Sequence, residues 1–237
     1  MRSSRSAPDP LAPGPLGFAH RGLHGSGVPE NSLAAFRAAL AIGAGIECDV
    51  RATVDGVPHV FHDERLDRLI GDARCLRHLH SDEARGLKLL GSGEHVPSLR
   101  ELLALIAGRV PLLIEVKREI GLERLCTAVA EELADYRGPV AVMSFDPRVP
   151  RWFATNAPSI RRGLIIDSRL KPWWRELFLR TAHAQFYAVD CRAIDQRWVA
   201  RMRARRPVYS WTVRSAQDRV KVAKHADAPI WEGDGRP

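Results

Sequence analysis

Short apolar runs rich in Val, Ile, Leu and Phe alternate along the chain with segments of helical periodicity. Near-continuous apolar runs of this kind are typical of strands that are buried on both faces. They predict eight strands, over residues 16–22, 45–53, 57–63, 110–118, 139–146, 161–167, 186–194 and 207–214. Apolar residues at helical spacing predict helices between most of these strands, over residues 31–43, 98–108, 122–136, 147–157, 172–184, 195–204 and 215–226.

Repeated strand–helix units predict an α/β fold in which helices cover a parallel sheet. Eight such strands in one domain favour a closed (β/α)8 TIM barrel, and the 237 residues of the chain suit one barrel. The alternative is a doubly wound open sheet, which needs fewer strands and a glycine-rich dinucleotide loop. The sequence contains neither the GxGxxG pattern nor a P-loop, so the barrel is the better prediction.

Residues 66–97 interrupt the alternation with charges, histidines and glycines that follow no period. We expect a small insertion after the third predicted strand, lying over one end of the fold. Asp55 and Gly56 suit a tight turn, so strands 45–53 and 57–63 are predicted to form a hairpin or a similarly tight connection.

The first fifteen residues are basic and rich in Pro, Ser and Gly, which predicts a disordered N-terminal lead-in over residues 1–15. They lack the apolar core of a secretory signal. Residues 16–237 are then expected to form a single domain that includes the insertion. No window approaches the ~18 consecutive apolar residues of a membrane span, so none is expected.

Four cysteines lie far apart, and no pair has CxxC spacing, so neither a zinc site nor a redox motif is indicated. We predict reduced, mostly buried thiols and a cytoplasmic location. These cysteines are Cys48, Cys75, Cys126 and Cys191.

The formal charge is +8, and much of the surplus arginine falls after Arg161. A basic run such as residues 197–207 could attract nucleic acid or anionic lipid. No aromatic-rich motif for single strands accompanies it, so we interpret the run as the solvated face of an outer helix and expect no specific nucleic-acid partner. The charge is also compatible with phosphorylated substrates. The sequence does not determine the oligomeric state.

Ionisable residues end the first four predicted strands, where a barrel places its active groups. Side chains two apart on a strand share a face, so Glu47 and Asp49 point the same way, as do Glu115 and Lys117. Two histidines, three acids, an arginine and a lysine would therefore meet at one mouth. They are His20, Arg21, Glu47, Asp49, His62, Glu115 and Lys117.

The three carboxylates of this set predict a metal site. The residues around Glu47 and Asp49 are too apolar for a solvent-facing edge strand. Burying two like charges is costly unless a cation neutralises them, and a divalent ion does so most simply. Three carboxylates without a cysteine favour Mg²⁺ or Ca²⁺ over zinc, and the sequence does not choose between these two ions. The predicted ligands are Glu47, Asp49 and Glu115.

Two histidines in one mouth indicate a general base and a general acid, which predicts catalytic roles for His20 and His62. Arg21 and Lys117 would hold an anion and offset charge that builds in a transition state. This combination fits phosphoryl transfer to water or to an internal hydroxyl. The remaining histidines are predicted to be structural or exposed: His24, His59, His78, His80, His95, His183 and His225.

An ordered set of short motifs is familiar: HRG, PENS, ECDV, DG, HVFHDERLDR, IEVK, SFD and SWTV. Together, between Phe18 and Val213, they resemble the glycerophosphodiester phosphodiesterase family. The resemblance implies a TIM barrel with a small insertion after the third strand. It also implies hydrolysis of glycerophosphodiesters, such as glycerophosphocholine, to glycerol 3-phosphate and an alcohol in phospholipid and glycerol metabolism.

The resemblance assigns roles residue by residue. The metal-binding acids of the family match Glu47, Asp49 and Glu115, and its catalytic histidines match His20 and His62. Its phosphate-binding cations match Arg21 and Lys117, a tryptophan that closes one wall of the substrate site matches Trp211, and an acid that supports the site matches Glu30.

Two segments depart from the family pattern. The third-strand motif usually ends with Arg, a small residue and Thr, whereas this chain has Arg68, Leu69 and Ile70. Many members also end in a Thr-Asp-Pro segment, where this chain has Trp231 and Glu232. The second change concerns the wall that grips the leaving alcohol, so the resemblance does not imply a head group.

Two other functions compete with this interpretation. Phospholipase D-like enzymes that act on lysophospholipids or sphingomyelin share the barrel and the histidine pair. They are usually secreted and disulfide-bonded, which the missing signal and the scattered cysteines argue against. A catalytically silent barrel that only binds phosphodiesters is the other alternative, and the presence of all seven polar site residues argues against it.

Overall fold

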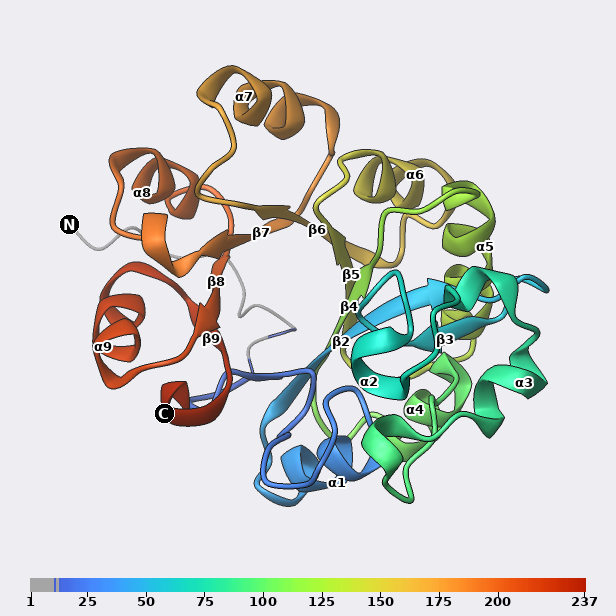
Figure 1. Cartoon of the computed structure of the whole chain (residues 1–237). Helices are drawn as coiled ribbons and strands as arrows, with labels where there is room; N and C mark the ends of the chain where they lie inside the picture. Colours follow the sequence, from blue (N-terminus) through green and yellow to red (C-terminus); the bar gives the residue numbers. More distant parts are fainter. Residues whose placement is uncertain (1–10, 12) are drawn as a thin grey trace.

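The computed structural model describes Leu11 and residues 13–237. Most of the predicted disordered lead-in therefore lies outside the described residues. Within residues 13–237, eight parallel strands form a barrel with helices around it, as Figure 1 shows, so the predicted TIM barrel is confirmed. The barrel strands are β1 (Phe18–His20), β2 (Gly45–Ala52), β4 (Leu112–Val116), β5 (Val140–Ser144), β6 (Arg161–Ile166), β7 (Phe186–Asp190), β8 (Val208–Val213) and β9 (Ala228–Trp231).

The ring is closed by β1, which pairs in parallel with both β2 and β9. Phe18 lies opposite Gly45 on one side and opposite Ile230 on the other. Each other barrel strand pairs in parallel with its two neighbours in the ring. A sheet closed in this way has no free edge, which excludes the doubly wound alternative.

The segment predicted as the third barrel strand is not part of the ring, and that prediction is wrong. β3 (Pro58–Val60) pairs antiparallel with β2. β2 continues to Ala52, past its pairing with β4, and the chain then turns back through Gly56 at a positive φ of 85°. The predicted hairpin is confirmed. The last strand of the ring is β9, which the sequence pattern did not predict because it is short and contains Pro229.

The insertion over residues 66–97 follows β3 and lies between the second and third strands of the ring. It packs around its own apolar cluster, which includes Leu66, Leu69, Leu76 and Leu79. Figure 1 shows its helices on the same side of the barrel as β3 and α4. The helices of the insertion are α2 (Asp67–Ile70), η1 (Leu76–His78), α3 (Ser81–Gly86) and η2 (Leu89–Gly91).

Helices that cover the outside of the barrel begin at serine caps in several units. The Ser32 hydroxyl accepts a hydrogen bond from the amide of Ala35, and Ser98 forms a reciprocal capping box with Glu101. Such caps satisfy amides that the first turn leaves without partners. The outer helices are α1 (Leu33–Ala41), α4 (Leu99–Ile106), α5 (Leu122–Leu133), α6 (Arg148–Asn156), α7 (Pro172–Thr181), α8 (Arg197–Arg203) and α9 (Ala216–His225), with short turns at η3 (Cys191–Ala193) and η4 (Gly233–Gly235).

Side chains along each barrel strand point alternately toward the outer helices and into the barrel. This alternation gives two apolar cores, and the site lies at the mouth of the inner one. On β4, Ile114 faces the helices, whereas Leu113 belongs to the cluster inside the barrel. Phe18, Phe186, Tyr209 and the described residue Leu11 fill the same interior. The next inward residue on β4 after Leu113 is Glu115. The barrel interior is therefore apolar below and charged at its C-terminal mouth.

All four cysteines are buried, as predicted, and Cys48 faces the helix side of β2, away from the carboxylates beside it. Among the described residues, no helix is both long and apolar enough to span a membrane.

Candidate active site

The predicted polar residues meet at the C-terminal mouth of the barrel, around a cavity of about 150 Å³. Asp49 lies beside this cavity and contacts the two cations that line it, Arg21 and Lys117. The polar lining consists of His20, Arg21, Glu47, His62, Glu115, Lys117, Thr212 and Arg214, and the apolar lining of Met143, Phe145, Ile165, Trp211 and Ile230. The structure thus brings every predicted site residue to one place.

Three buried carboxylates lie close together in the mouth, where their negative charges repel one another. Glu47, Asp49 and Glu115 each present an oxygen within 4.8 Å of the others. Their residues are 1%, 1% and 8% exposed. Burial raises the pKa of Glu47 well above its ordinary value, and the nearby charges of Asp49 and Glu115 raise it further. Burial also raises the pKa of Glu115. A cation would relieve this repulsion.

Two cations reach into the same cluster. The ammonium of Lys117 lies 2.7 Å from an oxygen of Asp49 and 2.7 Å from an oxygen of Glu115. The Nε of Arg21 lies 3.3 Å from the other oxygen of Asp49. Burial works to raise the pKa of Asp49, but Lys117 and Arg21 outweigh it and hold this pKa well below its usual range. Asp49 is therefore the ionised centre of the cluster.

The loop after β1 bends so that the backbone itself joins the site. Arg21 has a positive φ of 55°, and its amide donates to a carboxylate oxygen of Glu47 at 3.1 Å. Gly22 follows at φ 79°, where a Cβ would lie 2.8 Å from the backbone of Ala35, so a side chain does not fit. Asn31 then donates from its side chain to Asp49 at 2.9 Å. The HRG and PENS motifs thus shape one loop over the carboxylates.

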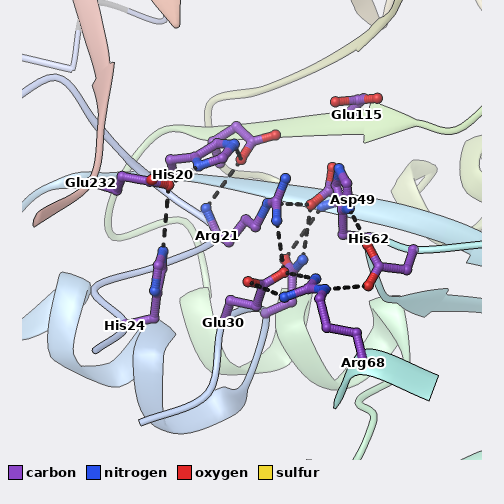
Figure 2. Close-up of polar contacts among 12 residues, drawn as sticks. His20, Arg21, His24, Glu30, Asp49, His62, Arg68, Glu115 and Glu232 are labelled. Carbon is purple, nitrogen blue, oxygen red and sulfur yellow. Dashed lines mark hydrogen bonds and ion pairs between the residues drawn. The ribbon is translucent and has the colours of Figure 1, made fainter. Parts of the chain in front are cut away.

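A chain of ion pairs supports His62 from the insertion side. Its Nδ1 lies 2.7 Å from Asp63, whose other oxygen accepts from Arg68 Nε at 2.5 Å. Arg68 also donates to Glu30, which accepts from Arg21 at 2.7 Å. Figure 2 shows this chain running from His62 to Arg21. Burial lowers the pKa of His62, which favours its neutral form.

His20 is held from the opposite side by a residue near the C-terminus. Its Nδ1 lies 2.7 Å from Oε2 of Glu232, and its Nε2 lies 4.0 Å from Glu47. Arg214 donates to the other oxygen of Glu232 at 2.5 Å. Burial lowers the pKa of His20, more than the hydrogen bond to Glu232 raises it. Because Glu232 holds Nδ1, the Nε2 of the ring is directed toward the carboxylate cluster.

An aromatic pair forms the wall opposite the charges. Trp211 and Phe145 meet edge to face with their ring centroids 5.2 Å apart. The indole of Trp211 donates to the carbonyl of Ala188 at 3.1 Å, which fixes the plane of the ring. The mouth therefore has one charged side and one apolar side.

Residues 20–228 match the model of the glycerophosphoryl diester phosphodiesterase family. The chain belongs to this family.

The chain is also similar to individual proteins with this family's name or fold. The chain is 36% identical over 172 residues to a glycerophosphodiester phosphodiesterase of Caldanaerobacter subterraneus, covering 67% of this chain and 70% of that one. A solved structure from Silicibacter pomeroyi has a TM-score of 0.82 and 25% identity, and the match covers 94% of this chain and 92% of that one. A phosphodiesterase of Oleispira antarctica, solved with the product sn-glycerol 3-phosphate, has the same fold, with a TM-score of 0.82, 24% identity and 92% of each chain covered.

Four residues that support the histidines were not predicted to do so, although the segment with Glu232 was expected at the wall that grips the leaving alcohol. Glu232 and Arg214 follow β9 and β8, and Asp63 and Arg68 support His62. The HVFHDERLDR motif did contain the last two, but nothing in it indicates an ion-pair chain. The contact of Glu232 with His20 could have been recognised only through β9, because it joins residues 212 positions apart.

Proposed function

We propose that this chain hydrolyses glycerophosphodiesters to sn-glycerol 3-phosphate and an alcohol with the help of a divalent metal ion. The observation that carries the proposal is the convergence of three buried carboxylates and two supported imidazoles on one cavity, in a chain of this family. Its curated relative from Caldanaerobacter subterraneus bears the name of this activity. The product bound to the Oleispira antarctica phosphodiesterase has the chemistry we expect here.

The carboxylate cluster fits a hard divalent ion. All donors of Glu47, Asp49 and Glu115 are oxygens, which suit Mg²⁺ or Ca²⁺. Burial and mutual repulsion raise the pKa of Glu47 and Glu115, and an ion between them would remove that penalty. When bound, the ion would polarise a phosphate oxygen and offset the charge of the transition state. Which of the two ions serves is left to experiment.

The two histidines would move the protons. Nδ1 of His20 is held by Glu232 and Nδ1 of His62 by Asp63, so both rings can present Nε2 to the substrate. One neutral imidazole accepts the proton of the nucleophile as its oxygen bonds to phosphorus. The other, protonated, donates to the alcohol oxygen as its bond to phosphorus breaks. The nucleophile is water or the 2-hydroxyl of the glycerol, which would form a cyclic phosphate first.

Arg21 and Lys117 would stabilise the anion during this step. Both side chains line the cavity and are already held by carboxylates. Because these two positive charges are in place before the reaction, they need not move as negative charge develops on the phosphoryl oxygens. Trp211 and Phe145 would contact the apolar parts of the substrate. We further propose a cytoplasmic enzyme of phospholipid and glycerol metabolism, as expected from its reduced cysteines.

A substrate panel tests this function. Metal-stripped protein is given Mg²⁺ or Ca²⁺ and the glycerophosphodiesters of choline, ethanolamine, glycerol and inositol, beside lysophosphatidylcholine and sphingomyelin. We expect release of glycerol 3-phosphate from at least one of the first four, abolished by a chelator. Release of choline from lysophosphatidylcholine or sphingomyelin, with the glycerophosphodiesters untouched, would instead indicate the phospholipase D-like activity. Binding without turnover of any ester would indicate a silent barrel.

A further inference from the structure

A second group of potential metal ligands lies on the other side of His20 from the carboxylate cluster. His20, His24 and Glu232 each present a nitrogen or an oxygen within 4.8 Å of the others. Oε2 of Glu232 lies 2.7 Å from His20 Nδ1 and 3.8 Å from His24 Nε2. Figure 2 shows both imidazoles directed toward this carboxylate. Three side chains from two distant parts of the chain therefore converge on one point.

His24 is the unexplained member of this group. Its Nε2 is buried and has no hydrogen-bond partner among the described residues. The separation of 3.8 Å from Glu232 is too long for a hydrogen bond. A buried polar atom without a partner is destabilising, and such atoms often mark the place of an ion or a water molecule. A ligand shared with Glu232 would satisfy this nitrogen.

We propose that His20, His24 and Glu232 bind a transition-metal ion of the Zn²⁺ class, and that this ion blocks turnover by taking Nδ1 of His20. Two imidazoles and one carboxylate are a donor set that suits Zn²⁺, with a water molecule as fourth ligand. The all-oxygen cluster of the proposed active site suits harder ions. The two sites would thus separate ions by ligand chemistry. The blocking of turnover rests on the proposed function, whereas the binding of the ion does not.

Neighbouring contacts restrain Glu232 and the loop that carries His24. Arg214 holds Oε1 of Glu232 at 2.5 Å and leaves Oε2 for the ion. Such outer contacts orient a metal ligand. His24 lies in a short loop in which the amide of Gly25 donates to Val28 at 3.0 Å and the amide of Val28 donates back at 2.8 Å. The backbone directly after His24 is therefore held in a closed turn.

Binding at Nδ1 would remove His20 from either of its possible catalytic roles. A neutral His20 ring that donates its Nδ1 proton to Glu232, 2.7 Å away, carries its lone pair on Nε2. An ion on Nδ1 requires the other neutral tautomer, in which the single ring proton is on Nε2. The ring then has no lone pair with which to accept a proton, and it cannot become the imidazolium that a general acid requires. A neutral ring exchanges no proton with the solvent in this step, whereas an imidazolium would release one when the ion binds.

Co²⁺ tests the site without relying on activity. With Mg²⁺ present in excess, Co²⁺ should bind the full-length protein with the visible absorption of a four-coordinate ion, and Zn²⁺ should displace it. His24→Ala removes one of the three ligands and should weaken binding by more than the about 10–100-fold that the loss of an outer contact of a ligand costs. Glu232→Gln should weaken it too, whereas His80→Ala should not, because the His80 side chain is 75% exposed on the insertion. Asp49→Asn should retain the absorption.

Activity then tests the inhibition. Zn²⁺ should inhibit glycerophosphocholine turnover by the wild-type protein. His24→Ala should keep its basal rate and need a Zn²⁺ concentration higher by more than about tenfold for the same inhibition. The site is refuted if the wild type lacks the Co²⁺ absorption, if His24→Ala retains it in full, or if Asp49→Asn abolishes it. Inhibition that His24→Ala leaves unchanged refutes the regulatory part. A protein that binds Co²⁺ in this way but turns over no glycerophosphodiester contradicts the proposed function and leaves the metal site standing.

Discussion

The two halves of the barrel mouth handle charge in different ways. At the ends of β5, β6 and β7, an aspartate is followed two residues later by an arginine that donates to its carboxylate and is largely solvent-exposed. At the ends of β1, β2 and β4, the charges pair mainly across strands, as Arg21 and Lys117 both do with Asp49. Lys117 also contacts Glu115, two residues before it on β4. The local pairs are Asp146 with Arg148, Asp167 with Arg169 and Asp190 with Arg192.

The pKa shifts differ between the halves: the local pairs lower the pKa of their aspartates, whereas the crowded half shows shifts in both directions. The hydrogen bonds from Arg169 lower the pKa of Asp167, and although burial works to raise the pKa of Asp190, its bonds with Arg192 lower it. On the other side, burial and neighbouring acids raise the pKa of Glu47 and Glu115, whereas Lys117 and Arg21 lower that of Asp49 against its burial. A charge satisfied by its own loop stabilises that loop. Charges that are crowded together and buried indicate a functional site.

The largest difference between the halves should appear in turnover. Replacing His20 or His62 with Ala should lower the rate of glycerophosphocholine hydrolysis by about 10²–10⁴-fold, because each removes a proton-transfer group. Arg192→Met, on the opposite half, should change it little. Rates are measured with Mg²⁺ or Ca²⁺, and circular dichroism checks the fold. A His62→Ala protein with nearly the wild-type rate would refute its assignment.

The two halves should also differ in how much their cations contribute to the free energy of unfolding. Lys117→Met leaves Asp49 and Glu115 without their shared cation in a buried place, which should cost about 3–5 kcal/mol of the free energy of unfolding in metal-free protein. Arg192→Met should cost far less, since Asp190 keeps hydrogen bonds from Ser168 and from the amide of residue 192. Urea denaturation measures both. Equal losses in the two variants would show that the charges at Lys117 are no more strained than those of the local pairs.

A bound metal ion should stabilise the folded protein only through the half of the mouth that holds the carboxylate cluster. At a concentration of Mg²⁺ or Ca²⁺ about 100 times the dissociation constant, the wild type should gain about 2.7 kcal/mol. Asp49→Asn should lose most of this gain, and the matched variant Asp190→Asn should keep it. Thermal unfolding with and without the ion provides the measurement. A gain that survives in Asp49→Asn would place the ion elsewhere.

The smallest expected difference lies in the pH dependence of stability. The pKa of Glu47 is raised, so folded metal-free protein retains a proton that the unfolded chain loses above 4.5. Stability should therefore fall as pH rises from 4.5 through the folded pKa, by at most about 1.4 kcal/mol per pH unit. Glu47→Gln should flatten this fall.

Asp167 should behave in the opposite sense and provides the matched control. Its pKa is lowered, so its contribution is present above the ordinary value of 3.8 and is lost as pH falls through the folded pKa. Asp167→Asn should thus flatten the acid side only. Identical pH profiles for Glu47→Gln and Asp167→Asn would contradict the division of the mouth into two halves.

The features that local sequence could predict are those set by local periodicity. Helical spacing and apolar strands fix most of the barrel units, and the spacing of Glu47 with Asp49, and of Glu115 with Lys117, indicates which face they share. The roles of these residues remain predictions, although their convergence is now seen. Metal identity is not encoded in this spacing.

The errors arise where distant parts of the chain meet. The segment of β3 has an apolar pattern like that of a barrel strand, and only its antiparallel pairing with β2 removes it from the ring. Pro229 argues against a strand over the four residues of β9, which pairing with β1 and β8 stabilises. Because β9 was missed, the contact of Glu232 with His20 was missed too.

The most direct measurement is the release of glycerol 3-phosphate from glycerophosphocholine by metal-stripped protein as Mg²⁺ or Ca²⁺ is returned. We predict that stripped protein is inactive and that the rate rises in step with the ion bound at Glu47, Asp49 and Glu115, reaching a plateau when that site is filled. The variant Glu115→Gln should need much more of the ion. Full turnover in excess chelator, or an unchanged titration with Glu115→Gln, would contradict a metal-dependent site at these carboxylates.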